Sequence, residues 1–298
     1  MVIPVYDKNP VRRTPVVTYT LIGLCTVVFL LGPISGFNPS YGSGDQLRCA
    51  QALYFDRWGV IPAELFHGRL PVDGLGLPAG CGVPNDYRKM PFLSVLSAMF
   101  VHGSWLHLIG NMLFLYVFGD NVESRMGRFR YLLFFLTAGY LATYGFALAN
   151  AGSTQTLVGA SGAISGALGA YLYLYPRARV TSLFPFLFFL PLRFPAWMVL
   201  GFWFALQWLA AQTSRSGPGV AYLAHVVGFV FGFLSTWVWF RRSPNDLPRG
   251  REWIRERRHA ASIARRRRES MWSIGDRRQR RKRSRRASRA RSLPRGRS

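Results

Sequence analysis

The sequence predicts an all-α polytopic membrane protein built from six transmembrane helices. Half of its 298 residues are hydrophobic, and they gather in long runs that are almost free of charge. A helix needs about 20 apolar residues to cross the hydrocarbon core of a bilayer, and Lys and Arg collect in the loops on its cytoplasmic side. Six runs are apolar and close to this length, and basic residues lie in most of the loops between them: Val16–Ile34, Ser104–Val122, Tyr131–Ala149, Gly159–Tyr175, Ala196–Gln212 and Val220–Phe240.

The first run follows a short basic segment with Lys8, Arg12 and Arg13, as a secretory signal peptide would. The run is long enough to span a bilayer, and no small-residue cleavage site follows it closely. We therefore interpret it as an uncleaved first helix, preceded by a basic cytoplasmic arm at 1–15. The predicted membrane domain then occupies 16–240.

Orientation follows from the basic residues of the short loops. The loops at 123–130 and 176–195 carry three Arg each, whereas the loop at 150–158 has no charge and that at 213–219 has only Arg215. Six crossings then put both termini in the cytoplasm. The absence of a recognisable organelle-targeting segment favours a bacterial plasma membrane.

A long first outside loop covers about 36–91 and is rich in Gly and Pro. Loops of this length usually have a function or a small structure of their own. Its Trp58, Phe66, Leu70 and Leu75 suggest partial insertion into the membrane interface. Cys49 and Cys81 both fall in this loop, where an oxidising compartment would permit a bond between them, although two free thiols are an equal alternative.

Two further segments are not predicted to span. The apolar run Leu183–Leu192 has about half the length a crossing requires and is interrupted by prolines, so we expect it at the inner interface. The tail at 241–298 carries 23 basic and 5 acidic residues and is predicted to be disordered. Contact with anionic lipid explains such a tail more simply than binding of nucleic acid does, and a solvated tail is the alternative.

Polar side chains inside a bilayer are costly, so each is a candidate functional residue. Helix rise places His107, Ser161 and His225 in the outer third of their respective helices, at a common depth. His107 and Asn111 share one helical face at a spacing of four. The candidate functional residues in the runs are His107, Asn111, Ser161, Ser165, Gln207 and His225, with His102 just before the second run.

Small residues predict close contact between the fourth and sixth helices. Gly162, Gly166 and Ala170 repeat at every fourth position, and so do Ala224, Gly228 and Gly232. Such patterns let membrane helices approach closely, which would bring Ser161 within hydrogen-bond reach of His225. Packing alone is the alternative explanation for the Gly159–Gly162 segment, but packing does not require two histidines and an asparagine at the same depth.

The segments at 102–111 (HGSWLHLIGN), 159–162 (GASG) and 224–232 (AHVVGFVFG) together resemble the rhomboid family of intramembrane serine proteases. The resemblance covers about 90–240 and implies a six-helix rhomboid-like bundle that cleaves transmembrane segments of other proteins. It assigns Ser161 as nucleophile, His225 as general base, and His107, Asn111 and the Ser161 backbone N–H as oxyanion donors. It implies neither a cofactor nor a metal.

The sequence departs from the family at Ser165, where an aromatic residue often stacks on the base. A bond from the Ser165 hydroxyl is our hypothesis for what holds His225. Acidic residues adjoin the later runs only at the inner end of the second run, about 20 Å from His107 by helix rise, so we expect a Ser–His dyad without an acidic third member. Aromatic residues of the fifth run resemble the proposed substrate gate of the family, although a lipid-facing stripe explains them as well.

Two other functions compete with proteolysis. A transporter or proton relay could use the same histidines, but it would favour broken helices and an internal repeat, and no such repeat is present. A non-catalytic rhomboid-like protein that binds membrane clients would typically lack the serine or the histidine. Both Ser161 and His225 are present in this chain.

Overall fold

The computed structural model describes residues 3–7, 9, 14–68, 78, 80–82, 89–184, 190–213, 220–241 and 262. The chain divides into two compact units, Met1–Arg242 and Ser243–Ser298, and the fold below is that of the first. The three basic residues of the arm, Leu70 and Leu75 of the first loop, and the tail apart from Arg241 and Ser262 lie outside the described residues.

A helix occupies each of the predicted runs. By length and hydropathy alone, two of the described helices, Arg128–Ala149 and Tyr222–Arg241, could cross a membrane, and Val16–Leu31 is apolar but shorter. Crossing by all six therefore remains a prediction. The bounds are α1 Val16–Leu31, α5 Trp105–Phe114, α7 Arg128–Ala149, α8 Ser161–Leu174, α9 Ala196–Thr213 and α10 Tyr222–Arg241.

The second run is longer than predicted. Helix α5 continues through a π-helical turn, η3 (Leu115–Gly119), into α6 (Asp120–Met126), and ends at Gly127, whose φ of 85° favours glycine. The helix starts after Ser104, whose hydroxyl accepts a bond from the His107 N–H at 3.1 Å. The cap fixes the first turn, and this turn carries His107.

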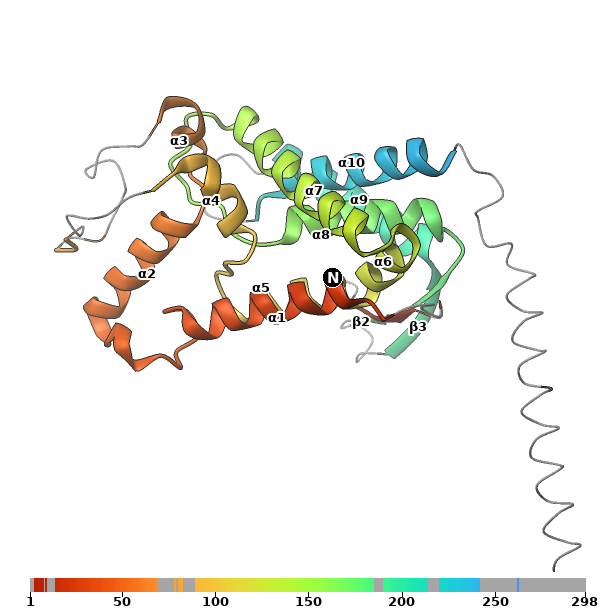
Figure 1. Cartoon of the computed structure of the whole chain (residues 1–298), viewed down its shortest axis with the longest axis horizontal. Helices are drawn as coiled ribbons and strands as arrows, with labels where there is room; N and C mark the ends of the chain where they lie inside the picture. The colour runs from red at the N-terminus through yellow and green to blue at the C-terminus, as the bar shows by residue number, and fades with distance from the viewer. Residues whose placement is uncertain are drawn as a thin grey trace, which may run out of the picture. The chain divides into compact units, whose positions relative to one another are not determined.

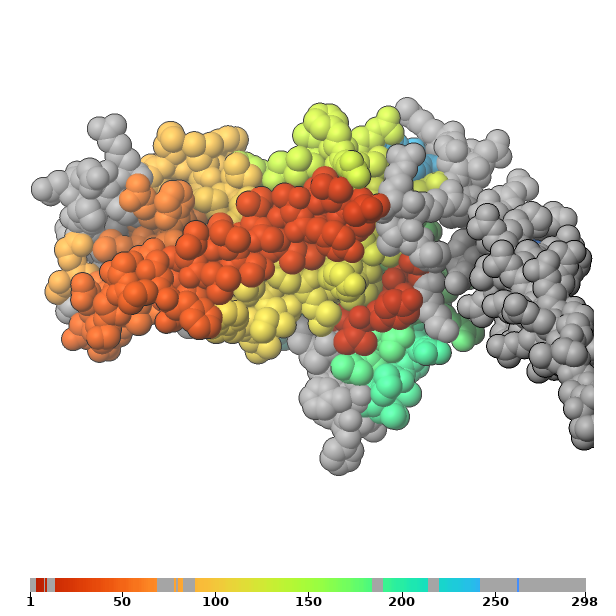
Figure 2. Space-filling model, turned by 60° about the horizontal axis from the view of Figure 1, so that its bottom comes forward, coloured from red at the N-terminus to blue at the C-terminus, as the bar shows by residue number. Residues whose placement is uncertain are grey.

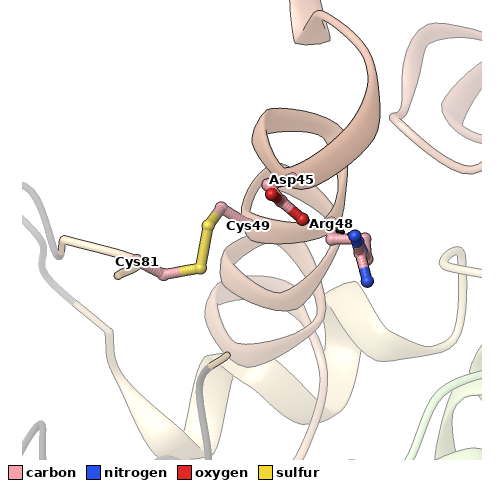
Figure 3. Close-up of a disulfide and its surroundings, with 4 residues drawn as sticks. All are labelled: Asp45, Arg48, Cys49 and Cys81. Carbon is pink, nitrogen blue, oxygen red and sulfur yellow. Dashed lines mark hydrogen bonds and ion pairs between the residues drawn. A yellow bond between two sulfur atoms is a disulfide. The ribbon is translucent and has the colours of Figure 1, made fainter. Parts of the chain in front are cut away.

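The loop at 36–91 has its own small structure, although its sequence shows no helical period. It contains the 3-10 turn η1 (Pro39–Tyr41), α2 (Gly44–Trp58) and α3 (Pro62–His67), and α4 (Pro91–Ala98) begins at its end. The structure joins Cys49 of α2 to Cys81 by a disulfide, beside the ion pair of Asp45 with Arg48 on the same helix (Figure 3). Its Trp58 and Phe66 remain 42% and 39% exposed.

The all-α prediction is wrong in one region. An antiparallel sheet of order β1-β2-β3 joins β1 (Ile3–Asp7), β2 (Arg179–Phe184) and β3 (Leu190–Pro195). It takes strands from the predicted N-terminal arm and from the Leu183–Leu192 run. Backbone groups in an apolar region need hydrogen-bond partners, and pairing supplies them to segments too short and too rich in proline for a helix. Pro191 and Pro195 lie in β3, at the edge of the sheet, where proline is tolerated, and Pro185 lies outside the described residues.

The helices α7, α8, α9 and α10 lie side by side, with α2, α3 and α4 gathered at one end of the bundle and β2 and β3 at the other (Figure 1). Helix α1 runs along one face of the molecule, beside α5 (Figure 2). Helix α8 is enclosed, since every residue from Ala163 to Tyr171 is buried. A helix that is apolar all round belongs in such a position. The first residue of α8 is Ser161.

Candidate active site

Close backbone contact between α8 and α10 builds the site. A Cβ added at Gly228 would overlap the carbonyl oxygen of Gly162, and one added at Gly232 would overlap that of Gly166. On the opposite side of α8, a Cβ at Gly162 would lie 2.7 Å from the Cβ of Ala142 in α7. The small residues therefore make the contact that the sequence predicts, and they bring the N-terminal ends of both helices together.

This contact pairs a serine with a histidine. The Nε2 atom of His225, in the first turn of α10, lies 2.8 Å from the Oγ atom of Ser161. The histidine is buried, with 8% of its surface exposed. A hydroxyl within hydrogen-bond distance of an imidazole can transfer its proton as it attacks an electrophile.

Two residues of α9 complete the surroundings of His225. The Nδ1 atom of the histidine lies 2.8 Å from Oε1 of Gln207, and the indole ring of Trp203 lies 6.0 Å from the imidazole, tilted by 31°. Ser165 does not bond to His225, because its hydroxyl donates to the Ser161 carbonyl at 2.7 Å. The hypothesis of a Ser165–His225 bond is therefore wrong. The sequence signal for this role of Gln207 is a polar amide within an otherwise apolar run.

His107 and Asn111 face the backbone just before Ser161. Gly159 has a φ of 117°, and a Cβ at this position would lie 2.7 Å from Nε2 of His107 and 3.6 Å from Nδ2 of Asn111. A side chain at 159 would fill the space that these two residues border. The φ value and the space both require glycine there.

The side chains of His107 and Asn111 each have an N–H group that can donate a hydrogen bond to a ligand. The Gly103 N–H donates to Nδ1 of His107 at 3.4 Å, which leaves the proton of a neutral ring on Nε2, toward Gly159. The Nδ2 atom of Asn111 is buried and has no hydrogen-bond partner among the described residues. An unpartnered buried amide is costly, so its retention suggests a partner that arrives with a ligand.

His102 is packed rather than directed at the serine. It is 1% exposed, its Nδ1 lies 3.2 Å from the carbonyl of Phe100, and its ring meets the ring of His107 edge to face at 5.1 Å. Its contact supports the ring of His107.

The extended segment before Ser161 is held from the first loop. Val60 and Leu157 exchange two backbone hydrogen bonds, at 2.9 and 2.7 Å, and the Gly159 N–H donates to the carbonyl of Ala98 at 2.8 Å. The N–H of Ser161, at the first position of α8, has no helical carbonyl to bond. The backbone that leads to the serine is thus fixed, and the serine N–H is available.

Comparison with known proteins identifies the family that this chain resembles. Residues 90–242 match the family model "Rhomboid domain". The chain is 30% identical over 149 residues to Rhomboid protein 1, mitochondrial, of Saccharomyces cerevisiae, covering 49% of this chain and 41% of the relative. It is 27% identical over 173 residues to RHOMBOID-like protein 6, mitochondrial, of Arabidopsis thaliana, covering 53% of this chain and 50% of the relative.

The fold and the match define a helical membrane protein of an intramembrane protease family. This chain belongs to the rhomboid family, as its three motifs predict. The match spans about half the length of these curated relatives or less. The names of both relatives place them in mitochondria, so they give no support to the expected bacterial plasma membrane.

Proposed function

We propose that this protein is an intramembrane serine endopeptidase in which Ser161 is the nucleophile and His225 the general base. The observation that carries the proposal is the 2.8 Å contact between Oγ of Ser161 and Nε2 of His225. Both residues lie within the matched family region. A serine hydroxyl becomes an effective nucleophile only when a base takes its proton, and a neutral imidazole suits this task near neutral pH.

In the first step, Oγ of Ser161 attacks the carbonyl carbon of the scissile peptide while its proton passes to Nε2 of His225. The carbonyl oxygen takes up the electron pair and becomes an oxyanion. Three donors border the place where this charge develops, namely Nε2–H of His107, Nδ2–H of Asn111 and the backbone N–H of Ser161. Donors fixed in a water-poor site stabilise such charge strongly.

In the second step, the tetrahedral intermediate collapses and the C–N bond breaks. His225 gives the proton to the amine of the leaving C-terminal fragment, and an ester now joins the carbonyl carbon of the N-terminal fragment to Oγ of Ser161. Water then attacks this ester with His225 again as base, which releases the acid and regenerates the serine hydroxyl. No external oxidant or reductant is required.

The proposal extends to topology and substrate. All six predicted runs cross the bilayer, both termini are cytoplasmic, and the end of the bundle that carries α2, α3 and α4 faces outside, so that the site opens to water from there. The substrate is a transmembrane helix that unwinds near its outer end. Exposed Phe202 and Trp208 on α9, at 57% and 51%, give that helix an apolar face along which such a substrate could approach.

The alternative function is binding of membrane clients without cleavage. Packing does not require His225 and Ser161 to be in hydrogen-bond contact, and binding does not require a free amide at Asn111. These features favour a hydrolase. A transporter is disfavoured because the serine and the histidine meet in hydrogen-bond contact at a helix start, an arrangement that ion coordination does not require.

A nucleophile-directed probe tests the proposal without a known substrate. A fluorophosphonate should label the wild-type protein, and Ser161→Ala should lose the label and also lose cleavage of a reporter transmembrane segment by at least about a thousandfold. Ser235→Ala is the matched control, because Ser235 lies on α10 and its hydroxyl bonds within its own helix, to the Gly232 carbonyl. Equal labelling of wild type and Ser161→Ala would refute the protease assignment.

A further inference from the structure

We propose that α9 positions the catalytic base: Gln207 sets the orientation and tautomer of His225, and Trp203 supports the face of its ring. This inference rests on the proposed function and adds a positioning residue to it. The two side chains are four residues apart, so they project from one face of α9. Both contacts, 2.8 Å to Nδ1 and 6.0 Å between ring centroids, converge on the same imidazole.

The chemistry of the amide decides which nitrogen carries the proton. Oε1 of Gln207 is a carbonyl oxygen, which can only accept a hydrogen bond. Nδ1 of His225 must therefore donate to it, and a neutral imidazole has one N–H only. The lone pair of Nε2 is left to face Oγ of Ser161, 2.8 Å away. This is the tautomer that a general base requires.

Burial explains why an amide and not a carboxylate stands here. Gln207 is 8% exposed, and the other residues of α9 from Ala196 to Ala211 are apolar, so an ionised carboxylate in this place would carry a large desolvation cost. A neutral amide accepts the same hydrogen bond without that cost. Gln207 thus serves the orienting role that an acidic residue serves in soluble serine hydrolases.

Trp203 supplies the aromatic contact that Ser165 cannot provide. The hydroxyl of Ser165 is turned to the Ser161 carbonyl. The indole of Trp203 instead lies against the imidazole at a shallow angle of 31°, and it also packs on Phe229 of α10 at 6.0 Å. The ring of His225 is therefore held by a hydrogen bond at its edge and by an aromatic ring near its face.

The test compares variants at 207 that keep or remove the acceptor. Gln207→Leu removes it at similar volume, Gln207→Asn shortens the side chain beyond reach, and Gln207→Glu keeps an oxygen at the same position. Leu133→Ala is the control, because Leu133 lies on α7, not on the α9 face proposed for substrate approach, and is 49% exposed. For each purified protein, kcat and KM on a reporter transmembrane segment and the rate of fluorophosphonate labelling are measured, with thermal unfolding as the check on folding.

A positioning role predicts that Gln207→Leu and Gln207→Asn lower kcat and the labelling rate by about 10- to 100-fold, as misplacement of a reacting group does, with KM within about twofold of wild type. Gln207→Glu keeps an acceptor oxygen but adds the desolvation cost of a buried carboxylate, so it should lose less rate than Gln207→Leu and unfold at a lower temperature than wild type. Leu133→Ala should match wild type. Wild-type rates in Gln207→Leu, or equal losses in all three variants, would overturn the inference. If the wild type itself is not labelled, the proposed function fails instead, which separates the two outcomes.

Discussion

Gly228 of α10 lies against the carbonyl oxygen of Gly162 in α8, so closely that no Cβ fits between them. One residue before Gly162 stands Ser161, and three residues before Gly228 stands His225. Direct backbone contact therefore sets the distance between the two groups of the proposed dyad. A small outward shift of either helix would lengthen the 2.8 Å distance between Oγ of Ser161 and Nε2 of His225 and break their hydrogen bond.

Gly228→Ala should disturb the proposed site through this contact alone. Because the new methyl overlaps backbone and not a flexible side chain, the helices must separate, and misplacement of the reacting atoms by about 1 Å can cost about 100-fold in rate. The loss is measured as fluorophosphonate labelling per folded protein. Gly201→Ala on α9 is the control, since a Cβ at Gly201 meets nothing within 4 Å. Equal labelling in both variants would contradict the packing argument.

Asn111→Ala should lower kcat by about 10²- to 10³-fold, or about 2.7–4 kcal/mol, the usual effect of removing one oxyanion donor. KM should change little, because the donor acts on charge that exists only in the transition state. Steady-state cleavage of a reporter segment measures both constants. Ile109→Ala, at a 57% exposed position of the same helix, should behave as wild type. Unchanged turnover in Asn111→Ala would assign the residue to packing.

The Cys49–Cys81 disulfide links residues 32 apart in sequence, with a Cα–Cα distance of 5.4 Å. Mass spectrometry should detect alkylation of both only after reduction, and modification of both without reductant would show that the bond is absent. The double variant Cys49→Ser/Cys81→Ser should lower the free energy of unfolding of the loop by about 2–4 kcal/mol. Cys25→Ala, at the buried free thiol, is the comparison for loss of a cysteine as such.

Asp7 of β1 gives the protein a predicted pH dependence. Its carboxylate accepts bonds from the Tyr171 O–H at 2.5 Å and from Nδ2 of Asn121 at 3.0 Å, and burial raises its pKa from 3.8 to about 6. The folded state thus binds the proton more tightly than the unfolded state does. The contribution of Asp7 to stability is fully present below about pH 4, falls as pH rises through about 6, and is constant above that.

Asp7→Asn should therefore raise the thermal stability of the purified protein at neutral pH and flatten its pH dependence between about pH 4 and pH 7. The change should be at most about 1.4 kcal/mol for each tenfold difference in proton affinity between the folded and unfolded states. The measurement is thermal unfolding in detergent across that range. Asp45→Asn is the control, because Asp45 forms an exposed ion pair of small energetic value. A pH profile identical to that of wild type in Asp7→Asn would contradict the assignment.

Several features of the fold can be predicted from local pattern because their physical cause lies within the segment. Length and hydropathy mark the apolar run that forms α7, and a four-residue spacing places His107 and Asn111 on one face. The small residues around Gly162 and Gly228 predict close approach of α8 and α10 for the same reason. These patterns, with the three family motifs, are sufficient to predict the family and to nominate Ser161 and His225.

Other features depend on partners far away in the sequence. The strand at Ile3–Asp7 is stabilised by β2, and its Asp7 bonds to Tyr171, 164 residues away. No helical period in 36–91 indicates α2. This helix leads to Val60, whose backbone pairs with that of Leu157, 97 residues further along the chain. Extended segments such as β1 and the one at Val60 satisfy their backbone hydrogen bonds with distant partners and not along the segment, so local pattern predicts neither the strand nor the pairing.

The amino-acid sequence alone is enough to predict the family, the apolar runs and the serine and histidine of the proposed dyad, because composition, spacing and motif are local properties. The side chains that surround His225, in contrast, are decided by the packing of the helices. Ser165 is adjacent to the site in sequence but turns its hydroxyl to its own helix, whereas Gln207 reaches the imidazole from another helix. Which of two polar side chains meets a buried histidine depends on how three helices pack, and that geometry is a property of the whole fold.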